Sequence, residues 1–590
     1  MNTPPANSSR LPKVVVVLLW AITFAAAPLA VLLLFATFLQ FFLGSSDLHP
    51  LLRTYIAILF APFLVFVWLR GAALWREGFR WLPKPQARRL YWGTAIAFIS
   101  LLVLCYSAEA WRGRRAYAKF MREVESRGVR LDLQQVIPPP VRDEENFCAT
   151  PLLAAMTVHV PTWAFGVRDT RASDPAIEER LRAFNLFEDS YPTSHRYSWT
   201  RAEFIDLAKW RDRFAANSNA PAAVQAESPT AAVLLALQRY DSDWNELRSA
   251  NLRPHARWLA RYEDGWLGVN TLVFRHKTLW NFVCALDLQA AAELRLNRSD
   301  AALEDVKLAL RLADTLQPEP SESSHRLRLD LIISTLQPVW EGLAARCWSE
   351  AQLADLQTRL EQFDLGADWR RAVRGEQILY LDFFQRMKTM ASLDTIFWHH
   401  ETLSPKARFF WGVLWAFIPS GWYYDDMAFI GRIYEHTLAR PSPFDVLPSS
   451  TKEEEVRHTV PVGPISRTWV VPRAREMSSY TAGFFASANL AIQQARLACA
   501  LERYRLAQPE FPESLSALVP RFIEKLPTTG TNQKPLLGYR RTTGGSFILF
   551  PADMPDASDV WKRDQSQTRY HFVMRQGDGV WRYPTTSAPE

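Results

Sequence analysis

The chain has 590 residues and a formal net charge of +7, and its length leaves room for several domains. Residues 1–130 hold 16 Lys and Arg against 5 Asp and Glu, so the remaining residues carry a net charge of −4, which argues against a soluble domain that binds nucleic acid. Only 23 residues are glycine, which argues against glycine-rich loops that hold phosphate groups.

Three apolar runs near the N-terminus are long enough to be membrane spans. Val14–Gly44 has 31 residues without a charge and is interrupted only by Pro28. Tyr55–Trp75 is the second run, and Leu90–Ala108, with aromatic residues near both ends, is the third. A span needs about 20 apolar residues, whereas the apolar part of a signal peptide has roughly 7–15. The alternative for each run is a helix buried in a protein core.

The charges around these runs predict their orientation, because basic loops stay in the cytoplasm. The N-terminal tail and the second loop are basic; they contain Arg10, Lys13, Arg76, Arg80, Lys84, Arg88 and Arg89. The first loop has only Arg53. This pattern places the N-terminus in the cytoplasm and the large C-terminal part in a bacterial periplasm, with the chain in the inner membrane.

A second group of basic residues follows the third run directly. With this group included, the numbers of Lys and Arg on the two sides of the membrane are nearly equal. These residues sit where anionic lipid headgroups would lie, so we expect them to contact the membrane surface. They are Arg112, Arg114, Arg115 and Lys119.

Beyond this group, apolar residues recur with helical spacing over Tyr117–Val124, and Gly128 is a natural end for the helix. Pro138–Pro140 then predicts an extended connection. We expect a mainly α-helical chain in four parts. These are a three-span anchor (1–111), a basic helix with a proline-rich connection (112–146), a large helical body (147–455), and a long helix with a small α+β tail (456–590).

Within the body, Leu279–Leu296 and Asp300–Leu316 predict a helical hairpin in which Ser299 or Asp300 caps the second helix. The hairpin resembles half of a tetratricopeptide-type array. Only one copy is found, which favours an ordinary hairpin over a solenoid.

Two further segments of the body have recognisable sequence patterns. Ser349 and Gln352 form a capping box that begins another helix. Phe409–Tyr424 is aromatic but contains Pro419 and Gly421 and is short for a span; a core helix is favoured over a helix on the membrane surface.

In the tail, Phe484–Leu506 predicts a long helix. Three short strands are expected after it, at Ser546–Phe550, Arg569–Met574 and Gly579–Tyr583. The last two strands would be joined by a hairpin turn at Gly577–Gly579.

Several short segments resemble a family of uncharacterised bacterial membrane-anchored proteins with an exported helical body. The segments are Leu131–Leu133, Pro138–Val141, Asn146–Phe147, Gln337–Leu343, Trp348–Leu353, Arg374–Glu376 and Pro419–Tyr423. Glu502–Arg505, Phe511–Leu515 and Leu518–Pro520 are similar to the segment after the long helix in type II secretion pseudopilin-like modules. The resemblance covers about residues 110–590, contains no catalytic motif and implies an exported body. No prepilin leader precedes the Phe484 helix, and Thr528–Thr529 replaces the Asp-Pro of the family.

Motifs for nucleotide binding, for serine hydrolysis and for zinc proteolysis are absent from the sequence. The cysteines are far apart, without Cys-x-x-Cys spacing, so neither a zinc site nor a redox pair is indicated. His399-His400-Glu401 is a poor metal site, because adjacent helical residues point in different directions. Asp553, Asp556 and Asp559 lack the spacing and the glycine of a calcium loop. We therefore expect no metal and no cofactor.

Four carboxylates remain as weak candidates for a polar site. Asp143 and Glu144 could act as an acid–base pair, although a solvated run is the more common explanation. Glu341 and Glu376 lie in apolar helices with Arg346 and Arg374 nearby in the sequence. Buried ion pairs explain them as well as catalysis does.

The leading hypothesis is a non-enzymatic, membrane-anchored envelope protein that serves as a structural or interaction scaffold. Its expected partners are anionic lipid headgroups and an envelope protein. The alternative is an envelope hydrolase that uses the carboxylates of the body. A pocket that gathers the four candidates would favour the hydrolase, and dispersed carboxylates would favour the scaffold. A transporter subunit is disfavoured, because no predicted span has an interior carboxylate.

Overall fold

The computed structural model describes a mainly helical chain with one small sheet near the C-terminus, as the sequence predicts. It describes residues 85–157, 174–190, 198–216, 228–270, 276–387, 420–440, 442, 444, 471–530, 533–542, 545–552 and 580–583. The chain divides into two compact units, Met1–Arg112 and Gly113–Glu590.

The predicted spans Val14–Gly44 and Tyr55–Trp75 lie outside the described residues. The third, Leu90–Ala108, lies in helix α3 (Pro85–Glu125). Over the described part of the chain, no helix combines the length and the hydropathy that crossing a membrane requires.

The C-terminal part of α3 packs against helix α16 (Ser420–Leu438) inside the second unit. Phe120 and Val124 of the predicted apolar stripe are fully buried. A Cβ added at Gly113 would lie 2.1 Å from the carbonyl oxygen of Gly421, so only glycine permits this close approach. Gly128 follows the helix with a φ of 78°, which confirms the predicted helix end.

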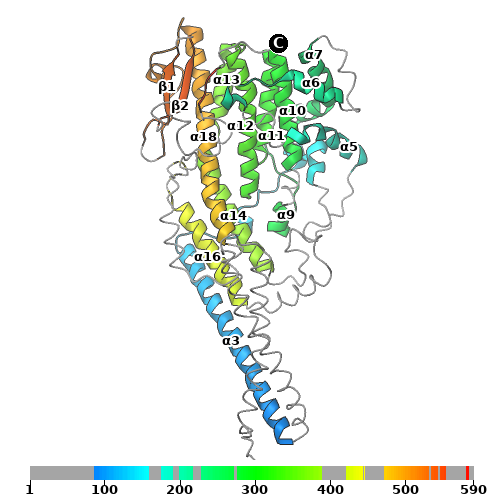
Figure 1. Cartoon of the computed structure of the whole chain (residues 1–590), viewed down its shortest axis with the longest axis vertical. Helices are drawn as coiled ribbons and strands as arrows, with labels where there is room; N and C mark the ends of the chain where they lie inside the picture. The colour runs from blue at the N-terminus through cyan, green and yellow to red at the C-terminus, as the bar shows by residue number, and fades with distance from the viewer. Residues whose placement is uncertain are drawn as a thin grey trace, which may run out of the picture. The chain divides into compact units, whose positions relative to one another are not determined.

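Two helical hairpins form the centre of the body, and both helices of the first lie beside the first helix of the second (Figure 1). The first consists of α10 (His276–Arg295) and α11 (Ser299–Asp314), and the second of α12 (Glu322–Ala344) and α13 (Glu350–Glu361). Each turns at a residue in the left-handed region, Asn297 with a φ of 58° and Arg346 with a φ of 56°.

The second helices of the two hairpins run parallel to each other, because their side chains meet at both ends. At the N-terminal ends, Gln352 Nε2 donates to Asp300 Oδ1 at 2.6 Å and to Ser299 Oγ at 3.1 Å. At the C-terminal ends, Arg359 Nη2 lies 3.4 Å from Asp314 Oδ2. Helix α13 therefore lies beside α11 and runs in the same direction. The choice of an ordinary hairpin over a solenoid stays a prediction.

The two capping predictions had different outcomes. The capping box of Ser349 and Gln352 is confirmed. Helix α11 begins at Ser299 after Arg298, which makes no side-chain cap, so the predicted cap by Ser299 or Asp300 is wrong. Those two side chains accept hydrogen bonds from Gln352 instead.

Helix α18 (Val471–Ala507) joins the predicted tail to the body. It contacts α12, α13, α16 and α14 (Leu365–Met387), and its small residues Ala488, Ala491 and Ala495 are fully buried. These contacts place α18 in the same compact unit as the helices of the body.

The body also contains several short helices, and a cluster of aromatic rings near them contacts α10. Phe184 stacks on Tyr240 with ring centroids 4.2 Å apart and contacts Phe282 of α10. The helices are α4 (Pro151–Ala154), α5 (Pro175–Ala183), α6 (Leu207–Ala216), α7 (Pro229–Leu237), α8 (Asp241–Ala250) and α9 (Trp266–Asn270).

The small sheet pairs β1 (Leu537–Arg541) with β2 (Phe547–Pro551) in antiparallel register. The predicted strand Ser546–Phe550 is confirmed as β2, whereas β1 was not predicted. Trp581, from the predicted strand Gly579–Tyr583, forms a bridge with Leu549. Arg569–Met574, Gly577–Gly579 and the Asp553–Asp559 segment lie outside the described residues.

Candidate functional site

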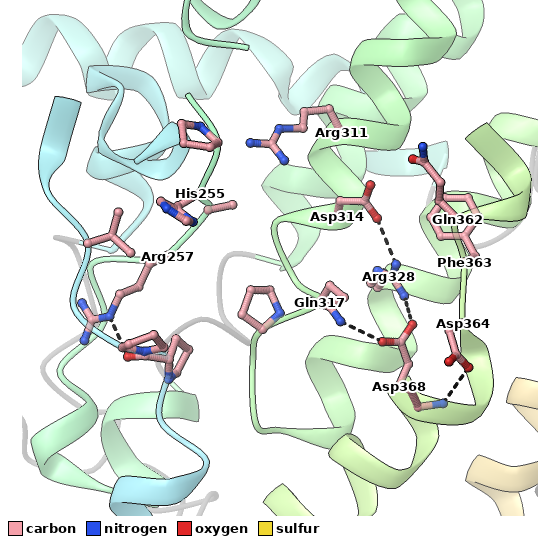
Figure 2. A pocket seen from close by; sticks show the side chains of 17 residues that line it. His255, Arg257, Arg311, Asp314, Gln317, Arg328, Gln362, Phe363, Asp364 and Asp368 are labelled. Atoms are coloured by element: carbon pink, nitrogen blue, oxygen red, sulfur yellow. Dashed lines mark hydrogen bonds and ion pairs between the residues drawn. The ribbon is translucent and has the colours of Figure 1, made fainter. Parts of the chain in front are cut away.

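A partly open pocket of about 490 Å³ lies in the second unit. One wall comes from the proline-rich connection, at Pro138–Val141, and from Pro254–Arg257. The other comes from the C-terminal end of α11, the first turns of α12, and the turn between α13 and α14. Figure 2 shows His255 and Arg257 on one side and Asp314, Arg328 and Asp368 on the other. The volume is in the range of small-molecule sites.

Ion pairs neutralise the helical wall. Arg328 is 3% exposed and donates from Nη2 to Asp314 Oδ1 at 2.9 Å and from Nη1 to Asp368 Oδ2 at 2.5 Å. Gln317 Nε2 donates to the other oxygen of Asp368 at 3.1 Å. This network also holds α11, α12 and α14 together.

Two arginines, one from each wall, contact carbonyl oxygens and aromatic rings. Arg257 Nε donates to Pro138 O at 3.0 Å, and its guanidinium lies 4.7 Å from the ring centroid of Tyr262. Arg311, from α11, donates from Nη2 to Arg253 O at 2.8 Å and lies 5.0 Å from the ring of Phe147. Neither makes an ion pair with a carboxylate of the described residues.

A buried acid lies behind this wall. Glu319 is fully buried, and Tyr262 Oη donates to its Oε1 at 2.5 Å. Burial raises the pKa of Glu319 to about 7. The backbone oxygen of Glu319 contacts Nε2 of His325 at 2.9 Å, and burial lowers the pKa of that imidazole to about 3.

The four candidate carboxylates of the sequence analysis are not gathered in this pocket. Asp143 and Glu144 are exposed in a short 3₁₀ helix, Asp143–Glu145. Arg253 donates to the backbone oxygen of Asp143 at 3.2 Å, so this contact does not involve the carboxylate of Asp143.

Glu341 lies near the C-terminal end of α12 and is 1% exposed. Its Oε1 accepts the backbone N–H of Ile205 at 2.7 Å and Nε2 of Gln337 at 2.9 Å. Arg295 Nη2 lies 3.3 Å from Oε2, an ion pair without the alignment of a hydrogen bond. The predicted partner Arg346 is therefore wrong, and the guanidinium comes from α10.

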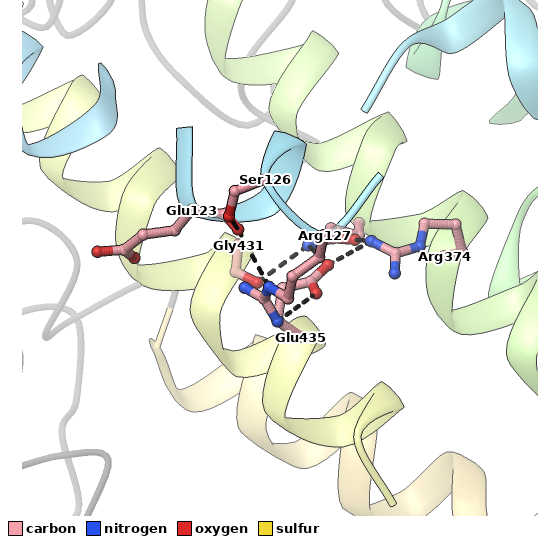
Figure 3. Close-up of polar contacts among 7 residues, drawn as sticks. Glu123, Ser126, Arg127, Arg374, Gly431 and Glu435 are labelled. Atoms are coloured by element: carbon pink, nitrogen blue, oxygen red, sulfur yellow. Dashed lines mark hydrogen bonds and ion pairs between the residues drawn. The ribbon is translucent and has the colours of Figure 1, made fainter. Parts of the chain in front are cut away.

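Glu376 lies on α14 beside the first turn of α12. Its Oε2 accepts the backbone N–H of Glu322 at 2.9 Å. Burial raises the pKa of Glu376 to about 7. Burial and the charge of Glu376 raise the pKa of Glu322 well above its usual value. The predicted partner Arg374 is also wrong: Figure 3 shows it directed to Glu435 of α16, together with Arg127.

The distance along α12 separates the buried candidates. Glu376 contacts the backbone N–H of Glu322. Glu322 lies 19 residues from Glu341 on α12, or about 28 Å at 1.5 Å per residue. No single small substrate contacts both positions.

The predicted membrane-surface residues are all exposed on α3. Arg112 pairs with Glu109 at 2.8 Å, and Lys119 lies 3.9 Å from Glu123. Among the residues that the structure describes, no group of three His, Cys, Asp or Glu could hold a metal ion. His399-His400-Glu401 lies outside them.

The sequence analysis missed Arg257 and Arg311 because it treated Pro138–Pro140 only as a spacer. The available signal was weak: a proline run and isolated arginines separated by more than 50 residues.

Comparison with known proteins assigns no family: no family model, no curated protein and no solved structure matches the chain. The resemblance to membrane-anchored proteins with a pseudopilin-like tail stays a prediction.

Proposed function

We propose that the chain is a membrane-anchored protein of a bacterial envelope, and that its helical body is an interaction scaffold for an envelope partner. The anchor is supported by the uncharged run Val14–Gly44 and by Tyr55–Trp75. With Leu90–Ala108 as the third span, the N-terminus lies in the cytoplasm and the second unit in the periplasm, as the loop charges favour.

The candidate carboxylates are dispersed, and this observation favours a scaffold over a hydrolase. Acid–base pairs that cleave one bond lie within about 10 Å of each other. Glu341 and Glu376 lie at opposite ends of α12, and Asp143 and Glu144 are solvated. Each buried candidate also accepts a backbone N–H that fixes a neighbouring segment. These contacts are those of structural groups.

The exposed basic group on α3 supports contact with anionic headgroups. Each Lys or Arg near such a surface is worth about 1 kcal/mol. Arg114 and Arg115 are exposed, so their side chains can reach lipid phosphates without breaking the core.

Reporter fusions test the anchor and its orientation. Fusions after Gly44, Lys84 and Ala216 are expected to report periplasm, cytoplasm and periplasm. Insertion of the reporter in a matched position of a cytoplasmic protein is the control. A cytoplasmic signal after Ala216 would overturn both the orientation and the envelope location.

A further inference from the structure

The last turns of α3 pack against α16, and at their N-terminal end the two helices approach closely. A Cβ added at Gly113 would lie 2.1 Å from the carbonyl oxygen of Gly421, so no side chain separates the two backbones there. One turn further along, the rings of Tyr117 and Tyr424 have centroids 5.9 Å apart.

At the C-terminal end, the contacts between the same two helices are ion pairs. Glu123 of α3 lies 3.6 Å from Arg432, and Arg127 lies 3.3 Å from Glu435, the pair that Figure 3 shows. Taken in order along α3, the four partners on α16 lie 308, 307, 309 and 308 positions later in the sequence. Because this offset is nearly constant, the two helices run parallel and in register over residues 113–127 and 421–435.

The parallel course brings the N-terminal ends of the two segments to one level. The predicted third span ends at Ala108, and five residues of α3 separate it from Gly113, or about 7.5 Å at 1.5 Å per residue. The headgroup layer on each side of a bilayer is about 5–8 Å thick. With Leu90–Ala108 as a span, Gly113 and its neighbour Gly421 therefore both lie at the outer edge of this layer.

The side chains at this end of the helix pair match the chemistry of the headgroup layer. Trp422, in the first turn of α16, is partly exposed, as are Tyr117 and Tyr424. Trp and Tyr are enriched at membrane–water interfaces, because each has an apolar ring and a polar group. The sequence that leads into α16, Phe409–Pro419, is rich in aromatic residues and has no charge. The ion pairs lie at the opposite end of the pair, away from the predicted span.

We infer that the first turn of α16 lies in the headgroup layer, level with Arg114 and Arg115 of α3, and that Trp422 contacts lipid. This inference rests on the proposed membrane anchor and adds a second lipid contact to it. The second contact comes from a part of the chain more than 300 residues after α3. A body that contacts the bilayer at two points cannot rotate freely about α3.

Photo-crosslinking of the full-length chain in nanodiscs of phosphatidylcholine and phosphatidylglycerol tests this inference. Benzoylphenylalanine replaces one residue in each of three proteins, Trp422, His436 or Ile96. His436 is the matched control, because it lies two heptads after Trp422 on nearly the same face of α16 and about 21 Å further along the helix. Ile96 lies in the predicted third span and is 61% exposed, so it tests the anchor itself.

We expect mass spectrometry to detect lipid adducts at positions 422 and 96 and their loss at position 436. An adduct at position 96 without one at position 422 would overturn the inference and leave the anchor in place. Equal adducts at positions 422 and 436 would also overturn it, because the helix pair would then lie along the membrane surface. Absence of an adduct at position 96 would show that the proposed anchor is wrong, and the inference would fail with it. If replacement of Trp422 lowers the helix content measured by circular dichroism, the same replacement at the partly exposed Ser420 decides.

Discussion

At its C-terminal end, helix α12 buries Glu341 beside the guanidinium of Arg295, whereas at its N-terminal end it buries Glu322 beside a second carboxyl group, that of Glu376. Both ends use a carboxyl group to accept a backbone N–H from another segment. They differ in how the charge is compensated. A buried acid with a cation nearby can remain ionised, but two buried acids together favour the protonated form. Burial raises the pKa of Glu341, but Arg295 and two hydrogen bonds oppose this rise, whereas no cation opposes the rise in the pKa of Glu376 to about 7.

The largest expected effect is at the end with the ion pair. Glu341→Ala removes the acceptor of Ile205 N–H and leaves Arg295, whose side chain is 11% exposed, without a counter-charge. Breaking such a buried pair costs about 3–5 kcal/mol, measured as the free energy of unfolding in denaturant. Glu350→Ala is the matched control, because Glu350 forms an exposed ion pair with Arg503 and should cost less than about 1 kcal/mol. Equal losses in the two variants would contradict the account.

A smaller effect of opposite sign is expected at the other end. The folded state holds a proton on Glu376 up to about pH 7, whereas the unfolded chain releases it near pH 4.5. The free energy of unfolding therefore falls as pH rises from about 4.5 to about 7. Glu376→Gln keeps an acceptor for the backbone N–H of Glu322 and removes this loss. Its effect on the free energy of unfolding should therefore be about 3 kcal/mol more favourable at pH 8 than at pH 4.5.

Denaturant unfolding of wild type and Glu376→Gln at both pH values measures this difference. Burial lowers the pKa of His276 to about 4 and that of His325 to about 3. The free energy of unfolding of the protein therefore falls as pH falls below about 6.5. The two imidazoles contribute the same pH dependence to both proteins and cancel in the difference. A variant destabilised equally at both pH values would show that Glu376 is not protonated in the fold.

Local features of this fold were predictable from the sequence. The capping box of Ser349 and Gln352 and the helix end at Gly128 depend on residues within four positions, so a short pattern determines them. Strand β1 was missed because Leu537-Gly-Tyr-Arg-Arg541 has no regular alternation of apolar residues.

The partners of the buried acids were not predictable, and the reason is geometric. Arg374 lies two positions from Glu376 on one helix, so the two side chains point in different directions. Arg346 occupies the left-handed turn after α12, away from Glu341. The true contacts, from Arg295 of α10 and from Glu322 of α12, depend on how helices far apart in the sequence pack together.

Infrared difference spectroscopy tests most directly whether the two ends of α12 differ in protonation. The measurement compares the carbonyl band of protonated carboxyl groups in wild type, Glu376→Gln and Glu341→Gln at pH 6, below the pKa of Glu376 at about 7. The account predicts that this band loses intensity in Glu376→Gln and keeps it in Glu341→Gln. Loss of intensity in Glu341→Gln alone, or in neither variant, would contradict the assignment of a neutral acid to one end of α12 and an ion pair to the other.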